Sequence, residues 1–209
     1  MFKEVDIERA LLWIEPGPVT LVSAFDGKRN HVMTISWTIA LDFAQRIAIC
    51  TGSWNHTFDV LMKSRECVVA IPPVSMAEKV IRIGDISGRK VDKFKKFGLT
   101  ALPASTVKAP LIAGCSANLE CSVIDHLENY NLVILQVNKV WESKKTERSK
   151  MFHAFGDGRF AANGKQMNYR ELMLDKLRLT CKRASVKGSP SAEGASTQYC
   201  PPVPANWPL

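Results

Sequence analysis

The chain has 209 residues, of which 46% are hydrophobic and 23% charged, and its formal net charge is +8. This is the composition of a globular protein with one main core, long enough to fold without disulfide staples. No apolar run approaches the ~20 residues of a membrane helix, and the first six residues lack the features of a secretory signal. We therefore expect a cytoplasmic protein without membrane contact.

The positive charge is spread along the chain, with only small basic groups at residues 93–96 and 144–148. A nucleic-acid interface would concentrate these residues with interleaved aromatics, so we expect no nucleic-acid partner. The charge suits a solvated surface that favours anionic small molecules. The six cysteines lack Cys-x-x-Cys and zinc-ligand spacing, which indicates free thiols in a reducing compartment and no metal site. They are Cys50, Cys67, Cys115, Cys121, Cys181 and Cys200.

Short strands with turns between them dominate the predicted elements. The first, over residues 19–25, is β-branched and ends at the turn pair Asp26-Gly27. The other predicted strands cover residues 32–41, 46–51, 66–71, 118–125 and 131–141. A set of short strands with few helices indicates an antiparallel barrel.

Three short helices are expected among these strands. Asn55 or Thr57 can cap the first, which ends near Ser64. The others are expected over residues 76–83, between a Ser75 cap and a Gly84 stop, and over residues 92–97.

The last third of the chain is less regular. Residues 153–160 hold two glycines and indicate a loop leading into a short strand, and residues 169–179 suit either a docked helix or an extended arm. From residue 184 on, Ser, Gly, Ala and Pro dominate. We therefore predict one domain over residues 1–183 and a flexible tail over residues 184–209.

Three polar clusters lie at the ends of strand-like runs. They are Asn30-His31-Val32-Met33-Thr34-Ile35-Ser36-Trp37, Thr51-Gly52-Ser53-Trp54-Asn55-His56-Thr57 and Ser87-Gly88-Arg89-Lys90-Val91-Asp92-Lys93-Phe94. Each combines small hydroxyls or amides with an aromatic residue, and the third adds fixed positive charge. A flat, phosphate-bearing redox ring needs these groups from a protein.

Each cluster also has an ordinary structural interpretation. Thr, Ile and Trp in the first are common in any hairpin strand. In the second, Ser53, His56 and Thr57 surround a helix start, which binds phosphate, although plain capping needs only one of them. In the third, a glycine permits close backbone approach, and Lys93 could equally be a solvated lysine on a helical turn.

With these residues, the chain resembles the flavin reductase-like family, the FMN-binding split barrels, from about residue 15 to about residue 160. The third cluster, followed by Phe97-Gly98-Leu99-Thr100, carries the most specific match. The resemblance implies a mainly β fold, an antiparallel Greek-key split β-barrel with a few short helices. It also implies noncovalently bound FMN, with FAD as a second possibility, and a homodimer.

The resemblance carries residue roles as well. Lys93 would place a cation near the polar edge of the ring, where it raises the flavin potential, or would pair with the phosphate. His153 would face the flavin where nicotinamide docks. These two are the catalytic candidates. The cofactor-binding candidates are Asn30, Met33, Thr34, Ile35, Ser36, Trp37, Thr51, Ser53, Trp54, Asn55, His56, Thr57, Ser87, Gly88, Lys93 and Phe94.

Two stretches depart from the family pattern. His31, beside Asn30, is an insertion relative to the commoner pattern, which affects the local register. Residues 42–46 stand where many relatives carry a Pro-Pro pair, so the geometry of that loop differs.

The function implied is that of an NAD(P)H:flavin oxidoreductase, passing electrons through flavin to free flavin, a ferric chelate or a protein. No Gly-x-Gly-x-x-Gly follows a strand, so NAD(P)H would be a transient donor without its own domain. Two alternatives stay open. One is a flavoredoxin-like electron carrier, acting on a redox partner protein, that NAD(P)H does not reduce directly. The other is a noncatalytic module that binds flavin or a partner.

Overall fold

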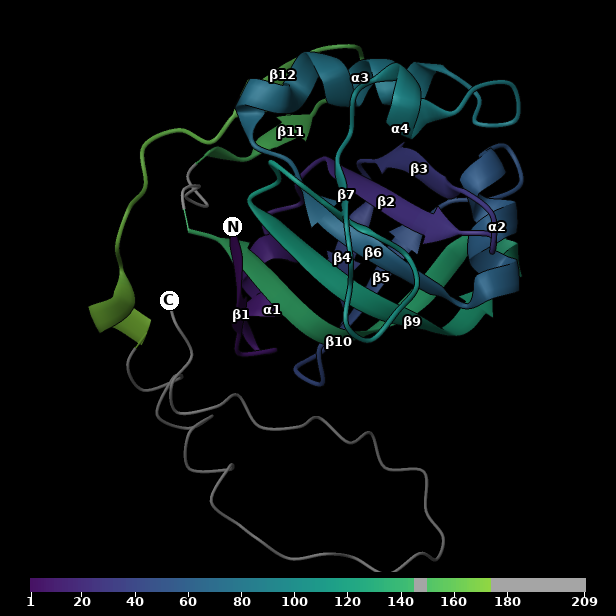
Figure 1. The fold of residues 1–209 in the computed structure, drawn as a ribbon. Helices are drawn as coiled ribbons and strands as arrows, with labels where there is room; N and C mark the ends of the chain where they lie inside the picture. The colour runs from purple at the N-terminus through teal and green to yellow at the C-terminus, as the bar shows by residue number, and fades with distance from the viewer. Residues whose placement is uncertain (145–149, 174–209) are drawn as a thin grey trace, which may run out of the picture.

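The computed structural model describes residues 1–144 and 150–173 (Figure 1). The tail predicted over residues 184–209 and the end of the segment predicted over residues 169–179 lie outside the described residues. No helix within the described part is long and apolar enough to cross a membrane.

A curled antiparallel sheet forms the body of the molecule (Figure 1). Its strands are β1 (Phe2–Val5), β2 (Thr20–Phe25), β3 (Asn30–Ile35), β4 (Thr38–Ala40), β5 (Arg46–Cys50), β6 (Glu66–Ile71), β9 (Ala117–Leu127) and β10 (Leu132–Ser143). Their spatial order is β3-β2-β6-β9-β10-β5-β4, and β1 pairs with β10. Because neighbours in this order are often distant in sequence, the topology is of the Greek-key type.

The two ends of this order, β3 and β4, follow each other directly in the chain. Ser36 and Trp37 join them, and the backbone N–H of Cys50 donates to the carbonyl oxygen of Trp37 at 3.0 Å. The curled sheet therefore meets itself at a seam that has no ladder between β3 and β4. This arrangement confirms the predicted mainly β split barrel.

Two further pairs of short strands and several helices complete the described fold. The pairs are β7 (Ala101–Leu102) with β8 (Leu111–Ile112), and β11 (Phe152–Ala154) with β12 (Phe160–Ala162). The helices are α1 (Arg9–Ile14), α2 (His56–Ser64), α3 (Ala77–Asp85) and α4 (Lys93–Lys96), with short 3₁₀ turns at Val74–Met76, Glu128–Tyr130 and Arg170–Met173.

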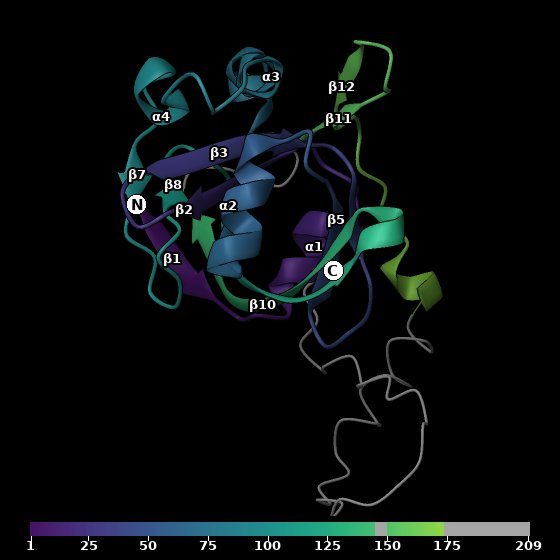
Figure 2. The same cartoon turned by 90° about the vertical axis from the view of Figure 1, so that its right-hand side faces the viewer.

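The helices pack on different parts of the sheet. Figures 1 and 2 show α3 and α4 above β3, and in Figure 2 α2 lies in front of the curled sheet. The inside of the barrel is filled by aliphatic side chains together with Trp13 and Ile14 of α1. A second apolar group, which includes Val80 and Ile83 of α3, fixes that helix against the strands. Helices α2, α3 and α4 thus bring polar loops to β3.

Three local expectations differ from the structure. The run predicted over residues 32–41 divides into β3 and β4, because the chain passes at Ser36-Trp37 from one end of the sheet to the other. Ser75 lies in a 3₁₀ turn and does not cap α3, whose N-cap is Met76. Helix α3 continues through Gly84, where an added Cβ would lie 3.2 Å from the Cβ of Thr34. This glycine permits close helix–strand contact and does not stop the helix.

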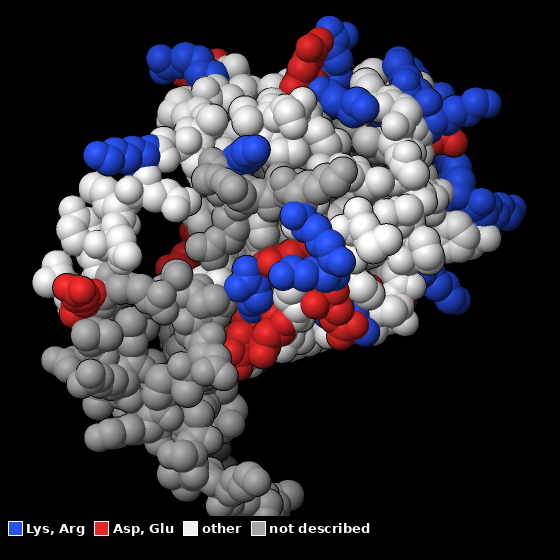
Figure 3. Space-filling model, turned by 60° about the vertical axis from the view of Figure 1, so that its left-hand side comes forward, with Lys and Arg blue, Asp and Glu red and all other residues white. Residues whose placement is uncertain are grey.

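The surface charge has no stripe-like arrangement on the face shown in Figure 3. Lys and Arg side chains are scattered over that face, and those near its centre lie beside Asp and Glu side chains. On this face the positive charge is therefore scattered rather than concentrated.

Candidate functional site

A shallow hollow lies at the seam of the barrel. It has a volume of about 180 Å³. We call it the ring hollow, and its lining residues are Thr34, Ile35, Ser36, Trp37, Cys50, Trp54 and Asn55. The first and second sequence clusters therefore meet here, although residues 38–50 separate them in the chain.

Two exposed tryptophans stand at the ring hollow. Trp37 is 69% and Trp54 62% exposed, which is unusual for so large an apolar side chain. The ring of Trp54 lies against Gly52, where an added Cβ would come within 2.4 Å of it. The absence of a side chain at Gly52 thus permits this position of the indole. Flat apolar walls of this kind suit a planar ring system.

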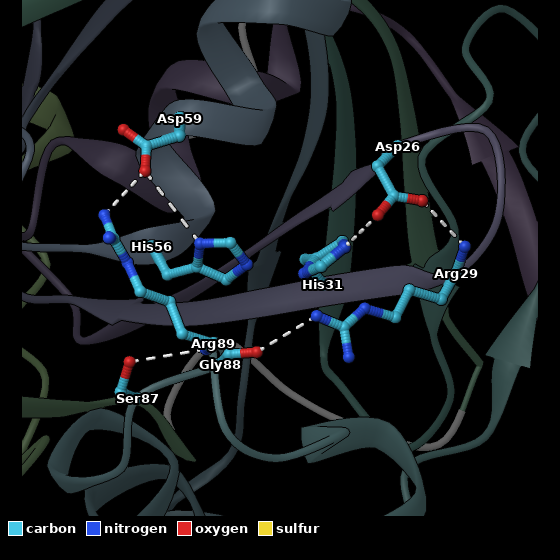
Figure 4. Close-up of polar contacts among 8 residues, drawn as sticks. All are labelled: Asp26, Arg29, His31, His56, Asp59, Ser87, Gly88 and Arg89. Carbon is cyan, nitrogen blue, oxygen red and sulfur yellow. Dashed lines mark hydrogen bonds and ion pairs between the residues drawn. The ribbon is translucent and has the colours of Figure 1, made fainter.

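Polar side chains from four segments gather at the opposite end of β3 (Figure 4). We call this group the polar cluster; its members are Asp26, Arg29, His31, His56, Asp59, Ser87, Gly88 and Arg89. Arg29 donates to the carbonyl oxygen of Gly88 at 3.3 Å, and Arg89 pairs with Asp59 at 2.8 Å. The β2–β3 turn, β3, helix α2 and the loop after α3 are therefore tied together at one place.

Two histidines face each other within the polar cluster. His31 is buried and its Nε2 lies 2.7 Å from Oδ2 of Asp26, while its ring meets that of His56 edge-on with centroids 5.2 Å apart. The backbone N–H of Arg29, followed by the ring of His31, holds the pKa of Asp26 well below its usual range. Burial, followed by the proximity of His31, lowers the pKa of His56.

The ring nitrogens of His56 have no hydrogen-bond partner among the described residues, although both atoms are buried. Nδ1 lies 3.9 Å from Oδ2 of Asp59, which is beyond hydrogen-bond range. Buried polar atoms are normally satisfied, so His56 is a group that a ligand could satisfy.

Lys93 closes the polar cluster from α4. It is 6% exposed, and its ammonium group donates to the carbonyl oxygen of Ile83 at 2.7 Å. Burial lowers its pKa to about 8. A small cleft brings Lys93 together with Asn30, His31 and Gly88. The cation thus lies beside the polar cluster while anchoring the last turn of α3.

Gly88 is the point of closest packing in this group. An added Cβ there would lie 3.3 Å from Cδ2 of His56 and 3.8 Å from Cε of Lys93. The residue is buried, whereas its neighbours Ser87 and Arg89 are exposed. The backbone at Gly88 can therefore approach a ligand that lies between His56 and Lys93.

Some predicted site residues lie apart from both groups. Met33 and Phe94 are buried in the two apolar cores, so only their backbone could meet a cofactor. Thr57 is 2% exposed, and Ser53 points into solvent at the loop before α2. Thr51 donates to Sδ of Met33 at 3.7 Å and accepts from Asn55 at 3.2 Å, which fixes the start of that loop.

His153 occupies a separate position on β11. Its Nδ1 lies 3.1 Å from the carbonyl oxygen of Gly17 and its Nε2 2.5 Å from the side-chain oxygen of Asn163. Both ring nitrogens are therefore engaged with groups that belong to none of the three clusters. The catalytic role given to His153 stays a prediction.

Sequence reasoning did not select five members of the polar cluster as site residues, namely Asp26, Arg29, His31, Asp59 and Arg89. Arg89 belongs to the Ser87-Gly88-Arg89 motif, so its position was a usable signal. Asp26 had a sufficient explanation as a turn residue, and its side chain does accept the backbone N–H groups of Lys28 and Arg29. Nothing in the pattern of α2 distinguishes Asp59 from an ordinary first-turn carboxylate.

The fold and the site together define the class of flavin reductase-like split barrels. A family model described as "Flavin reductase like domain" matches residues 14–162, and the chain belongs to this family.

Solved structures and a curated relative support this membership. The fold matches an FMN-binding domain of a flavin reductases-like enzyme from Shewanella baltica OS155 with a TM-score of 0.74 and 25% identity, covering 80% of this chain and 97% of that one. It also matches the flavoredoxin of Desulfovibrio vulgaris (Miyazaki F), with a TM-score of 0.67 and 21% identity over 73% of this chain and 89% of that one. An uncharacterized protein of Archaeoglobus fulgidus is 34% identical over 102 residues, which is 48% of this chain and only 58% of the relative.

Proposed function

We propose that the chain binds FMN noncovalently, with the ring at the ring hollow and the phosphate at the polar cluster. The observation that carries this proposal is the position of β3, which leads from one group to the other. The five residues from His31 to Ile35 are joined by four steps of extended strand and span ~13 Å, which suits a ligand with a ring, a short chain and a phosphate. Strand β3 ends the sheet order, so one of its edges carries no ladder.

The residues present fit such a ligand. The unsatisfied His56 nitrogens, the Arg29 and Arg89 guanidinium groups and the buried Lys93 supply donors and positive charge for a phosphate. The absence of side chains at Gly52 and Gly88 lets Trp54 and His56 lie close to the backbone at the ring hollow and the polar cluster. Trp37 and Trp54 provide apolar surface at the hollow.

The proposed activity is that of an NAD(P)H:flavin oxidoreductase. Bound FMN would supply the redox chemistry, taking electrons from NAD(P)H and delivering them to free flavin, a ferric chelate or a protein. The chain itself would hold the ring, fix the phosphate and place the Lys93 charge near the ligand. The hollow is shallow and open, which suits a donor and an acceptor that enter in turn.

A homodimer is part of this proposal. Ile39 of β4 and its neighbours Trp37 and Leu41, just before and just after the strand, are exposed at alternate positions, at 53%, 69% and 44%. Strand β4 is the other end of the sheet order, so it presents an open edge and an apolar face together. A second copy of the chain would cover both, next to the ring hollow.

The first test is the visible absorption of the purified protein during titration with FMN, followed by anaerobic addition of NADH and of NADPH. We expect flavin bands that bleach with one of the donors. Bands that neither donor bleaches would favour a flavoredoxin-like carrier. Failure to bind FMN at saturation would refute the flavin site.

A matched pair of glycine variants locates the site. Gly88→Ala puts a methyl group between His56 and Lys93, and we expect FMN affinity to fall about tenfold, the cost of one displaced charged contact. Gly164→Ala meets nothing within 4 Å and should bind FMN as the unaltered chain does. Equal affinity of both variants would place the phosphate elsewhere.

A further inference from the structure

Positive charge is concentrated on the two helices that cover β3. Residues 79–96 hold seven Lys and Arg residues against two carboxylates, Asp85 and Asp92, which is five of the eight net positive charges of the chain. Helices α3 and α4 lie next to each other on the outer side of β3 in both Figure 1 and Figure 2. We call the outer surface of these helices and the loop between them the basic face; its exposed cations are Lys79, Arg82, Arg89, Lys90, Lys95 and Lys96.

Four of these cations have no carboxylate partner among the described residues. Arg82 pairs with Glu78 at 2.8 Å, one turn away on α3. Arg89 pairs with Asp59 of α2, also at 2.8 Å. The ammonium groups that form no ion pair within residues 1–144 and 150–173 are those of Lys79, Lys90, Lys95 and Lys96. The basic face therefore presents uncompensated positive charge to the solvent.

The basic face is next to the ring hollow. Thr34 lines the hollow, and its hydroxyl donates to the carbonyl oxygen of Val80 in α3 at 2.7 Å. The absence of a side chain at Gly84 permits this contact, since an added Cβ would lie 3.2 Å from Cβ of Thr34. The ammonium group of Lys93 joins α4 to α3 through its hydrogen bond to Ile83. A molecule on the outside of α3 would thus be separated from the hollow by one helix diameter, ~10–12 Å.

The chemistry of the basic face favours an acidic protein over a nucleic acid or a membrane. Single-stranded nucleic acids bind where cations are interleaved with exposed aromatic rings, whereas Phe94, the one aromatic residue within residues 79–96, is buried. A helix that lies on a membrane turns its apolar side to the lipid, whereas Val80 and Ile83 of α3 are buried in the second apolar core. Free charges without a large apolar patch are typical of surfaces that steer a transient protein partner.

We propose that the basic face docks an acidic one-electron carrier protein, and that this protein accepts the electrons that NAD(P)H supplies. The electron transfer rests on the proposed function, whereas the docking does not. Each NAD(P)H gives up two electrons, which reduce two one-electron centres of the acceptor, and NAD(P)⁺ and one proton are released. The second copy proposed at β4 would lie at the other end of the sheet order, so the two partners use different surfaces.

The binding experiment uses two c-type cytochromes of similar size, one with net negative and one with net positive charge, and isothermal titration calorimetry. We expect the full chain to bind the acidic cytochrome alone, with an affinity that falls as ionic strength rises. Lys95→Gln/Lys96→Gln should weaken this binding about tenfold, because two exposed charge pairs are lost. Lys95→Arg/Lys96→Arg keeps the charge and should bind normally. The control Lys3→Gln/Lys63→Gln removes the same charge from exposed positions on β1 and α2 and should also bind normally.

The electron-transfer experiment adds FMN and NAD(P)H and follows the reduction of each cytochrome by its visible absorption. We expect the acidic cytochrome to be reduced faster than the basic one. Lys95→Gln/Lys96→Gln should slow the reduction of the acidic cytochrome and leave the reduction of a small neutral acceptor, 1,4-benzoquinone, unchanged. Slower reduction of both acceptors would show that these lysines act on the flavin site, and would overturn their role in docking.

The outcomes separate the docking from the proposed function. Equal binding of the two cytochromes, or unchanged binding in Lys95→Gln/Lys96→Gln, would overturn the basic face and leave the flavin site intact. Tighter binding of a DNA duplex, or of vesicles that contain phosphatidylserine, than of the acidic cytochrome would overturn it as well. A chain that binds the acidic cytochrome but no flavin would support the docking surface and overturn the proposed function together with the electron transfer.

Discussion

Lys93 is buried, although lysine side chains mostly stay in water. Its ammonium group stabilises the end of α3 by donating to Ile83, and a cation near a helix C-terminus is favourable. Burial disfavours the charged form of this side chain and therefore lowers the pKa of Lys93 to about 8. Burial of a charge near a polar cluster is often retained for function, and here the function would be to attract an anion.

The lowered pKa of Lys93 gives a stability prediction with a definite sign. Between about pH 8 and pH 10.5, the unfolded chain carries a proton on this lysine that the folded chain has lost, so stability rises with pH in that range. We expect the stability of the unaltered chain relative to Lys93→Met to increase by about 1 kcal/mol from pH 7.5 to pH 9.5, after allowance for solvent screening. Urea unfolding at both pH values measures this difference. Lys79→Met, at an exposed position, should show no such trend.

At the scale of elements, α1 depends on a single carboxylate of β10. Glu142 accepts from Nε of Arg9 at 2.7 Å and from Nε1 of Trp13 at 2.8 Å. Trp13 is 2% exposed and fills the barrel interior. The carboxylate therefore fixes the helix whose side chains close one end of the main core.

Replacement of Glu142 should lower the stability of the folded chain. In Glu142→Ala, the buried Trp13 N–H and the partly buried Arg9 lose their acceptor, and we expect about 3 kcal/mol lower stability. Glu4→Ala breaks the more exposed ion pair with Lys139 on the neighbouring strand and should cost at most about 1 kcal/mol. Chemical denaturation of both variants measures the contrast. Similar losses in both would show that Glu142 acts only as a surface charge.

Elements with a strong pattern were predictable, and those set by distant contacts were not. The apolar runs β5 and β6 are visible in the sequence because most of their residues are buried, and β10 is visible because its buried residues largely alternate with less buried ones. Helix α1 was missed because five of its six residues are buried, so no helical periodicity marks it. The division at Ser36-Trp37 depends on how the sheet closes, which no local pattern encodes.

For the candidate site, the residue types could be recognised from the sequence, but the contacts between distant segments could not. The clusters around Thr34, Trp54 and Gly88 were recognised from their residue types, and the structure brings two of them to one hollow. The pairing of Arg89 with Asp59 and the contact of His31 with His56 join segments far apart in the chain. Such contacts follow from the topology and not from spacing in the sequence.

At the scale of the whole molecule, the two ends of the sheet order have different environments. The end at β3 is covered by α3 and α4, whereas the end at β4 contacts α1 and carries the exposed side chain of Ile39, next to the exposed Trp37. Exposed sheet edges with apolar side chains tend to pair with another chain. The ring hollow includes Trp37, so the same surface would border the proposed flavin and the proposed partner copy.

A charge placed on this edge tests the proposed dimer. Ile39→Lys introduces an ammonium group at the centre of the exposed β4 face, where burial against a second copy would be unfavourable because a buried charge needs a partner. We expect the unaltered chain to sediment as a dimer and Ile39→Lys as a folded monomer with weaker FMN binding, since the hollow would lose its covering. Val74→Lys alters a residue of similar exposure before α3 and should remain dimeric. A monomeric unaltered chain that still binds FMN would show that one copy completes the site.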